Sequence, residues 1–269
     1  MKPKLFLILF VMITCCSERK APLEFVLDAN GVVNKINPQE KFIYLIFTGH
    51  FSTDDNGYFE NFDGAADVLL TLAEHGVKGS FFPTGICFTV DRYQQVMRDI
   101  IDQGHYLSAH SYHHLQLCSG RNREVSLVTL DSLANDTALM ENELQRFGLT
   151  KDDYQWLVPP YESCNQFSAD AYRSLGYKLA NPTPGLVTSS DWMGPDSPQY
   201  RSAEQLINNI WNFEKEHTLN GAIILIHAMN YPDRTDEDRP YKHLGEIIQK
   251  LKELGYGFQT FKDVIALEQ

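Results

Sequence analysis

The chain has little positive charge for its length. Its 269 residues include 23 lysine and arginine side chains against 35 aspartate and glutamate side chains, so the formal net charge is -12. A protein that binds nucleic acid needs a basic face to meet the phosphates, and this balance therefore argues against nucleic acid as a partner. Apolar residues make up 43% of the chain, which is enough for a sizeable core.

Cysteine is scarce too. Cys15 and Cys16 stand near the N-terminus, which leaves Cys87, Cys118 and Cys164 for the rest of the chain. An odd number excludes a fully paired set of disulfides, and the lack of a CxxC pair argues against a zinc site built from thiolates. We interpret these three cysteines as buried single thiols.

The N-terminal apolar run, residues 5–13, is too short to cross a bilayer as a helix. It follows a positively charged start and leads to Cys16, an order typical of a bacterial lipoprotein signal. Cys15 is the alternative acceptor, and a plain secretory signal or an uncleaved anchor is the alternative interpretation. We predict that residues 1–16 direct export and that the protein stays at the bacterial cell envelope, on the membrane through a lipid anchor only.

What the chain does contain is a regular alternation of apolar strands and amphipathic helices. The predicted strands are residues 42–47, 77–82, 105–109, 155–158, 177–180, 222–226 and 256–260. The predicted helices are residues 65–75, 93–103, 130–147, 168–175, 203–217 and 244–254. Such alternation implies parallel strands, in one barrel-like or doubly wound α/β domain. We expect that domain to cover residues 41–269, after a leader segment, residues 17–40, with a small hairpin at Asn30-Gly31.

Histidines gather where predicted strands end. His50 follows the first strand, His110 and His114 follow the third, and His227 follows the sixth. Because function in parallel α/β folds gathers at the carboxyl ends of the strands, these side chains are expected to meet. One such histidine is usually structural, whereas several that converge indicate a metal site or proton transfer. The charged stretch 231–239 is predicted to be a solvated loop on the same side.

Five short motifs in this order resemble the polysaccharide deacetylase family over about residues 42–262. They are Gly76-Val-Lys-Gly-Ser-Phe-Phe-Pro-Thr-Gly85, His110-Ser-Tyr-His-His114, Pro159-Pro160-Tyr161, Asp191-Trp192 and Leu225-Ile226-His227. The resemblance implies a distorted (β/α) barrel of about seven parallel strands. It also implies a hydrolase that removes acetyl groups from a carbohydrate, at a carbon–nitrogen amide or an ester bond, with one divalent metal.

The resemblance also implies roles for single residues. His110 and His114 match the family's two metal-binding histidines, and His227 matches its general acid. Tyr161 matches the position whose backbone N–H holds the oxyanion, and Asp191 lies in the segment that positions the acid histidine. The resemblance also implies that the Trp192 side chain forms a wall of the pocket against which a sugar ring packs.

The first motif departs from the family, which makes this chain a divergent member. The family ends its first strand with two aspartates, a base and a metal ligand, where this chain has Gly49 and His50. His50 would complete a site of three histidines, a set that suits zinc best, though cobalt or nickel could fill it. Glycine cannot act as a base.

The base therefore has several candidates. Asp54 and Asp55 follow a few residues later and could fold back, although a solvated turn is an equal alternative. Asp63 is a third candidate, and its position favours a helix cap. Glu162 stands at a strand end where the family has glycine, and Val158 replaces an arginine that supports the base there.

These departures leave three functions open. The favoured one is a metal-dependent deacetylase of an acetylated glycan or oligosaccharide. The first alternative is a catalytically degenerate lipoprotein that binds glycan, which the loss of the paired aspartates supports. The second alternative keeps the fold and hydrolyses a small non-peptide amide; a closed pocket would favour it over a wide groove.

Overall fold

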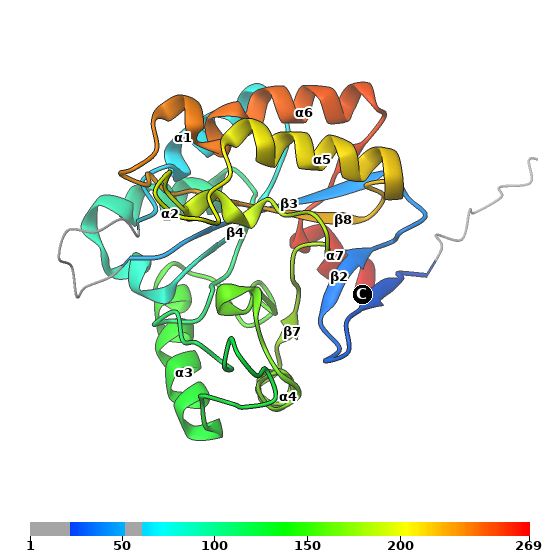
Figure 1. Ribbon diagram of the computed structural model, residues 1–269. Coiled ribbons are helices and arrows are strands. Elements are labelled where there is room, and N and C mark those ends of the chain that lie inside the picture. The colour runs from blue at the N-terminus through cyan, green and yellow to red at the C-terminus, as the bar shows by residue number, and fades with distance from the viewer. Residues whose placement is uncertain (1–21, 52–60) are drawn as a thin grey trace, which may run out of the picture.

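The computed structural model describes residues 22–51 and 61–269 (Figure 1). The predicted signal, with Cys15 and Cys16, and the candidate bases Asp54 and Asp55 lie outside the described residues. None of the helices within the described ranges combines the length and the apolar character needed to cross a bilayer.

The main sheet is mixed and is built around β3 (Phe42–Gly49), the long apolar strand that the sequence indicates. Its strand order is β1 (Phe25–Leu27), β2 (Val33–Ile36), β8 (Ala222–His227), β3, β4 (Ser80–Pro83) and β5 (Tyr106–Leu107), and β9 (Gly257–Phe258) pairs with the start of β3. Strands β3, β4, β5, β8 and β9 are parallel. The predicted hairpin forms as β1 and β2, and it joins this sheet because β2 pairs antiparallel with β8.

A second pair of parallel strands, β6 (Trp156–Leu157) and β7 (Lys178–Leu179), brings the number of parallel strands in the described residues to seven. A parallel bridge between Val33 and Ala180 joins β7 to β2. Strands β5 and β6 are not joined by backbone hydrogen bonds but by a side chain. The Tyr106 hydroxyl donates to the Trp156 carbonyl (3.1 Å) and accepts from the Trp156 N–H (2.9 Å). The prediction of a distorted (β/α) barrel is confirmed, with an antiparallel hairpin added to its wall.

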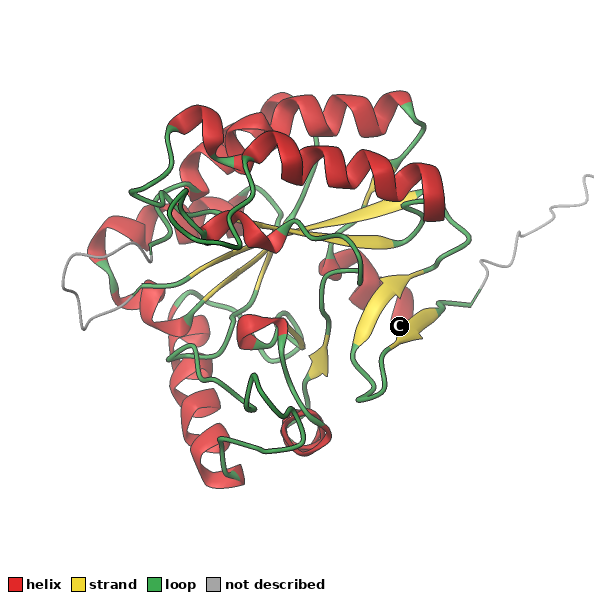
Figure 2. Ribbon diagram, viewed as in Figure 1, coloured by secondary structure: helices red, strands yellow, loops and turns green. Residues whose placement is uncertain are grey.

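Helices cover the barrel from both sides (Figures 1 and 2). They are α1 (Ala65–Glu74), α2 (Gln94–Asp102), α3 (Leu130–Arg146), α4 (Gln166–Ser174), α5 (Ala203–His217), α6 (Leu244–Glu253) and α7 (Phe261–Glu268). Helix α4 begins two residues earlier than predicted, because Asn165 caps it in a reciprocal pair with Ser168. Helix α7 was not predicted.

The alternation along β3 separates two cores. Ile43, Leu45 and Phe47 point outward, into the apolar layer beneath the helices. Tyr44 and Ile46 point into the barrel, where the ring of Phe261 from α7 packs among the aromatic side chains of four strands and closes that end. Thr48 is the next inward position, so the open end of the barrel lies at the carboxyl ends of the strands.

Candidate active site

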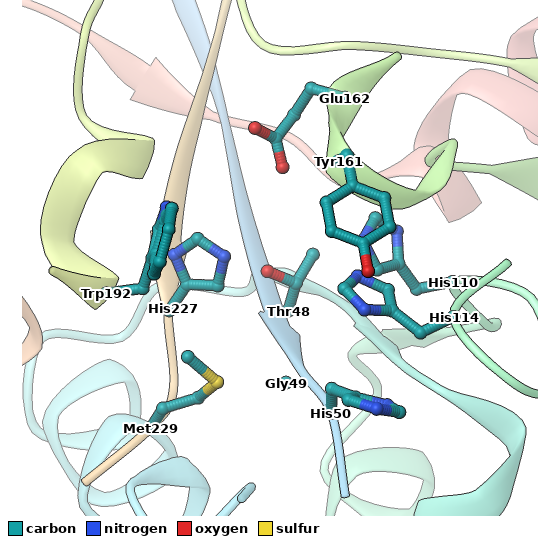
Figure 3. A pocket seen from close by; sticks show the side chains of 10 residues that line it. All are labelled: Thr48, Gly49, His50, His110, His114, Tyr161, Glu162, Trp192, His227 and Met229. Atoms are coloured by element: carbon teal, nitrogen blue, oxygen red, sulfur yellow. The ribbon is translucent and has the colours of Figure 1, made fainter. Parts of the chain in front are cut away.

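A pocket with a cavity volume of about 190 Å³ opens at this end of the barrel. Its walls come from segments far apart in the sequence, and the close-up in Figure 3 shows His114, Glu162 and His227 around a common space. The lining residues are Thr48, Gly49, His50, His110, His114, Tyr161, Glu162, Trp192, His227 and Met229. All four histidines that the sequence places at strand ends are among them.

One wall carries His110 and His114. His110 is buried, and its Nδ1–H donates to the Val158 carbonyl (2.7 Å), which leaves the Nε2 lone pair for another partner. The turn that follows has left-handed backbone at Ser111 (φ 60°) and at His114 (φ 56°), a conformation that costs free energy in non-glycine residues. This turn is what brings the second imidazole back toward the first, with ring centroids 5.1 Å apart.

Asp136 of α3 holds this turn in place, a role that no motif indicates. Its buried carboxylate accepts hydrogen bonds from the backbone N–H of Tyr112 (2.7 Å) and of His113 (3.0 Å). It also pairs with the His113 ring (2.9 Å), so His113 lies outside the pocket lining while His114 enters it.

His50 lies against the same wall. Its ring stacks on His114 with centroids 4.6 Å apart, and its Nδ1 is hydrogen-bonded to the Thr84 hydroxyl at 3.0 Å. Burial is the main cause that lowers the pKa of His50 to about 4 and that of His110 to about 3, and it lowers the pKa of His114 as well. All three imidazoles are therefore neutral at neutral pH, which is the form that binds metals.

Three neutral imidazoles are a donor set that fits a divalent cation such as zinc. In the described parts of the chain, however, no three histidine, cysteine, aspartate or glutamate side chains already converge on one ion position. The rings of His50 and His114 are stacked, and the lone pairs of stacked imidazoles, which lie in the ring planes, point side by side and not at one position. The donor chemistry fits a metal, while convergence requires the ring of His50 or His114 to turn.

The opposite wall carries His227 at the end of β8. Asp191 of the short 3₁₀ helix Ser189–Trp192 accepts from the His227 backbone N–H (2.8 Å) and from its ring Nδ1. Asp191 is 6% exposed, and each of its two carboxylate oxygens accepts a hydrogen bond from His227. The pair fixes the tautomer, and Nε2 of His227 is left to face the pocket.

Glu162 lies between the two walls, on a strained turn (Figure 3). Tyr161 (φ 58°) and Glu162 (φ 46°) are both left-handed, and the Asn181 amide donates to the Glu162 carbonyl at 3.1 Å. Burial raises the pKa of the Glu162 carboxyl above its ordinary value, and His227 and a hydrogen bond from Ser189 oppose this. The Tyr161 ring, 53% exposed, stacks on His114 with centroids 4.4 Å apart.

Sequence reasoning missed two further lining residues, Thr48 and Met229. The Thr48 hydroxyl is buried, and no hydrogen-bond partner for it exists within residues 22–51 and 61–269. Its position on the inward face of β3 was the available signal. Trp192, which the sequence did indicate, forms the rim with 42% of its surface exposed.

Asp63 does not have the role that we predicted from the sequence. We predicted a helix cap or a candidate base, but α1 has Gly64 at its N-cap and no side-chain cap. Asp63 instead accepts from Arg92 Nε (3.0 Å) and from the Tyr93 hydroxyl (2.7 Å), and it is absent from the pocket lining. Of the carboxylates weighed as bases, Glu162 is the one that the described pocket contains.

Comparisons with known proteins identify the family and the fold. Residues 35–180, more than half of the chain, match the family model described as polysaccharide deacetylase. The peptidoglycan-N-acetylmuramic acid deacetylase PdaA of Bacillus subtilis is 27% identical over 229 residues, which cover 85% of this chain and 73% of that protein.

Solved structures show the same fold. The structure of PdaA, a family 4 carbohydrate esterase, has a TM-score of 0.60 at 24% identity, with 89% of this chain and 87% of that chain covered. A CE4 family pseudoenzyme from Bacillus anthracis has a TM-score of 0.64 at 16% identity, with 88% of this chain and 70% of that chain covered.

Proposed function

This chain belongs to the polysaccharide deacetylase family and is a hydrolase of that type, and from this premise we propose that it removes acetyl groups from a carbohydrate by metal-assisted hydrolysis. The observation that carries the proposal is the pocket itself. It gathers three neutral imidazoles on one wall, a histidine–aspartate pair on the other, and the half-buried Glu162 between them.

His50, His110 and His114 would hold the metal, and zinc suits this donor set best. When bound, a divalent cation polarises the acetyl carbonyl and lowers the pKa of a water molecule that it binds. The chain contributes orientation: the Val158 carbonyl fixes the His110 tautomer, and Asp136 fixes the turn that carries His114.

His227 would act as the general acid. Its Nδ1 proton is held by Asp191, so its Nε2 is the atom that can carry a proton into the pocket. A carboxylate behind an imidazole stabilises the protonated ring, as in other acid–base pairs. His227 would therefore deliver its proton to the departing amine or alkoxide.

Glu162 would act as the general base. Its burial keeps the pKa of the carboxyl high, and a base works best when its pKa approaches the operating pH. The backbone N–H of Tyr161 would bind the oxyanion that forms on the acetyl carbon. Asp54 and Asp55 stay alternatives for the base, and Trp192 would contact the sugar ring at the rim.

We place the substrate in the bacterial cell envelope. The curated relative is named for its action on N-acetylmuramic acid in peptidoglycan, which fits an exported protein that meets an acetylated glycan. A lipid anchor after residues 1–16, a leader over residues 17–40 and a catalytic domain over residues 41–269 complete this proposal. The net charge of -12 argues against nucleic acid as a partner.

Metal content and acetate release measured on the same samples test the function. We would compare the full-length protein with His114→Ala, and with His217→Ala as a control at an exposed histidine on α5. About one metal per chain and acetate release from an acetylated glycan mixture, both lost in His114→Ala alone, would support the deacetylase.

The degenerate glycan-binding protein is the second candidate, and one observation favours it. Gly49 offers no carboxylate at the end of β3, where the family has its aspartate pair. A wild-type protein that binds glycan but contains no metal and releases no acetate would overturn the deacetylase and establish this alternative. Acetate release from a small acetamide alone would favour the small-amide hydrolase.

A further inference from the structure

Arg234, in the loop after β8, is buried although its neighbours in the sequence are charged and exposed. Its side chain is 0% exposed, so the prediction of a solvated loop is wrong at this residue. A guanidinium has five N–H groups, and a buried one must satisfy all of them. Arg234 does so, with an acceptor for each N–H.

Three of these acceptors lie on one stretch of chain, between β7 and α5. Arg234 Nε donates to the Met193 carbonyl (2.7 Å), and one terminal nitrogen donates to the carbonyls of Arg201 (2.6 Å) and Ser190 (3.5 Å). Ser190 and Met193 flank Asp191 and Trp192. The guanidinium therefore contacts the backbone on both sides of Asp191, which bonds His227, and of Trp192, which lines the pocket.

Asp238 provides the remaining two acceptors for Arg234. The other terminal nitrogen of Arg234 donates to the Asp238 carbonyl (2.8 Å) and carboxylate (3.2 Å). That carboxylate also accepts from the Tyr200 hydroxyl (2.7 Å) and from the backbone N–H of Ala203 (2.8 Å), the first residue of α5. The Tyr200 ring packs against the guanidinium at 4.8 Å, so the stretch is held at both ends and from one face.

Close packing of the two loops supports the same arrangement. A Cβ at Gly194 would lie 2.7 Å from the Cβ of Asp233 and 3.0 Å from the ring of Tyr231. The chain that follows Trp192 thus runs directly against the loop that carries Arg234, with room for glycine only. The segment that follows Trp192 and the loop that carries Arg234 are therefore packed tightly against each other.

We propose that Arg234 and Asp238 are positioning residues that hold the stretch Ser189–Met193 against the end of β8. They act through Asp191, which orients His227, and through Trp192, which forms the pocket rim. The inference rests on the proposed function for its catalytic readout, because the group being oriented is the proposed acid. We call the contacts of Arg234 and Asp238 with Ser189–Met193 the clamp. The clamp belongs to the folded chain, so it can be tested without substrate.

Arg234→Lys tests the clamp with the charge retained. Lysine has three donors on one atom, so it cannot meet five acceptors in the plane of a guanidinium. Arg146→Lys is the control, because Arg146 is an exposed arginine at the end of α3 that bonds Glu143, away from Ser189–Met193. We expect kcat for acetate release to fall on the order of tenfold to a hundredfold in Arg234→Lys, with a smaller change in KM and neither effect in the control.

Fluorine NMR of the full-length protein labelled with 5-fluorotryptophan gives a readout that needs no activity. The chain has three tryptophans, and Trp156 in the barrel core and Trp211 on α5 serve as internal references. We expect Arg234→Lys to move or broaden the Trp192 resonance alone, and Asp238→Asn to do the same. An unmoved Trp192 resonance would overturn the proposal, as would equal changes in all three resonances with a lower Tm, since those report a general loss of structure.

A double-mutant cycle separates positioning from a merely structural role. If Arg234 acts through Asp191, then Arg234→Lys should cost less kcat in an Asp191→Asn background than in the wild type. Additive losses would overturn that route. Should the wild type release no acetate, the proposed function fails, and the Trp192 resonance still decides whether the clamp exists.

Discussion

The ring of Phe62 fills the space in which a side chain at Gly49 would begin. A Cβ at position 49 would stand 3.2 Å from Cγ of that ring, with the ring edge closer still, and 3.1 Å from the Asn61 carbonyl. Phe62 is 1% exposed and belongs to the outer core. The end of β3 therefore lacks the family's aspartate at position 49. The Phe62 ring also leaves no room there for a larger side chain.

Gly49→Asp is accordingly expected to destabilise the fold without any gain in acetate release. The aspartate must displace a buried aromatic ring, and such overpacking costs about 1–3 kcal/mol. Urea unfolding measures the cost. Gly120→Ala is the control, because a Cβ there meets nothing within 4 Å. Wild-type stability together with higher activity in Gly49→Asp would show that the ring yields and that this position can still serve as a base.

Asp136→Asn is expected to weaken metal binding, although this residue lies outside the pocket lining. The asparagine keeps one oxygen but presents an NH₂ group to the backbone N–H groups of Tyr112 and His113, which loosens the turn that carries His114. Loss of such a support reduces metal affinity by about 10–100-fold. A competition titration with zinc measures it, with Asp131→Asn, exposed on the same helix, as the control. Equal affinities in both variants would contradict the prediction.

The residues at the strand ends show which part of the site could be predicted from the sequence. Each of His50, His110 and His227 ends or follows an apolar run, and parallel strands end at one edge, so their meeting in one pocket could be predicted. The supports could not. Asp136 looks like any polar residue of an amphipathic helix, and its link to Tyr112 exists only after the barrel has formed.

Other features failed for local reasons. Helix α7 is short, and its signal in the sequence is the reciprocal cap that Thr260 and Asp263 form at its start. The stacking of His50 on His114 depends on ring rotations, which no spacing specifies. Closure of the barrel by the Tyr106 hydroxyl is likewise a single long-range contact between aromatic residues that read simply as core.

Asp191→Asn is expected to reduce acetate release from a glycan on the order of 10²–10⁴-fold. The amide cannot stabilise a protonated His227 as the carboxylate does, so the departing amine or alkoxide receives its proton slowly. An aryl acetate is the diagnostic substrate, because a phenolate leaves without protonation. The variant should lose much less rate on the aryl ester than on the glycan, and equal losses on the two would remove His227 from the role of acid.

Glu162→Gln is expected to abolish most acetate release and yet to stabilise the fold at neutral pH. Burial raises the pKa of this carboxyl, so the folded chain binds the proton more tightly than the unfolded chain. The contribution of Glu162 to stability is therefore complete below the ordinary pKa of glutamate and is lost as the pH rises through the raised value. Glutamine keeps the shape without the buried charge and should remove that loss, which gives a higher Tm at pH 7 but not at pH 4.

The same substitution tests catalysis from the opposite direction. A base must be ionised, so wild-type kcat/KM should fall as the pH drops through the raised pKa of Glu162, and glutamine should reduce kcat on the order of 10²–10⁴-fold and erase that limb of the profile. Glu216→Gln, on the exposed face of α5, is the control and should change neither Tm nor rate. A more stable but fully active Glu162→Gln protein would keep the buried-charge explanation and transfer the role of base to Asp54 or Asp55.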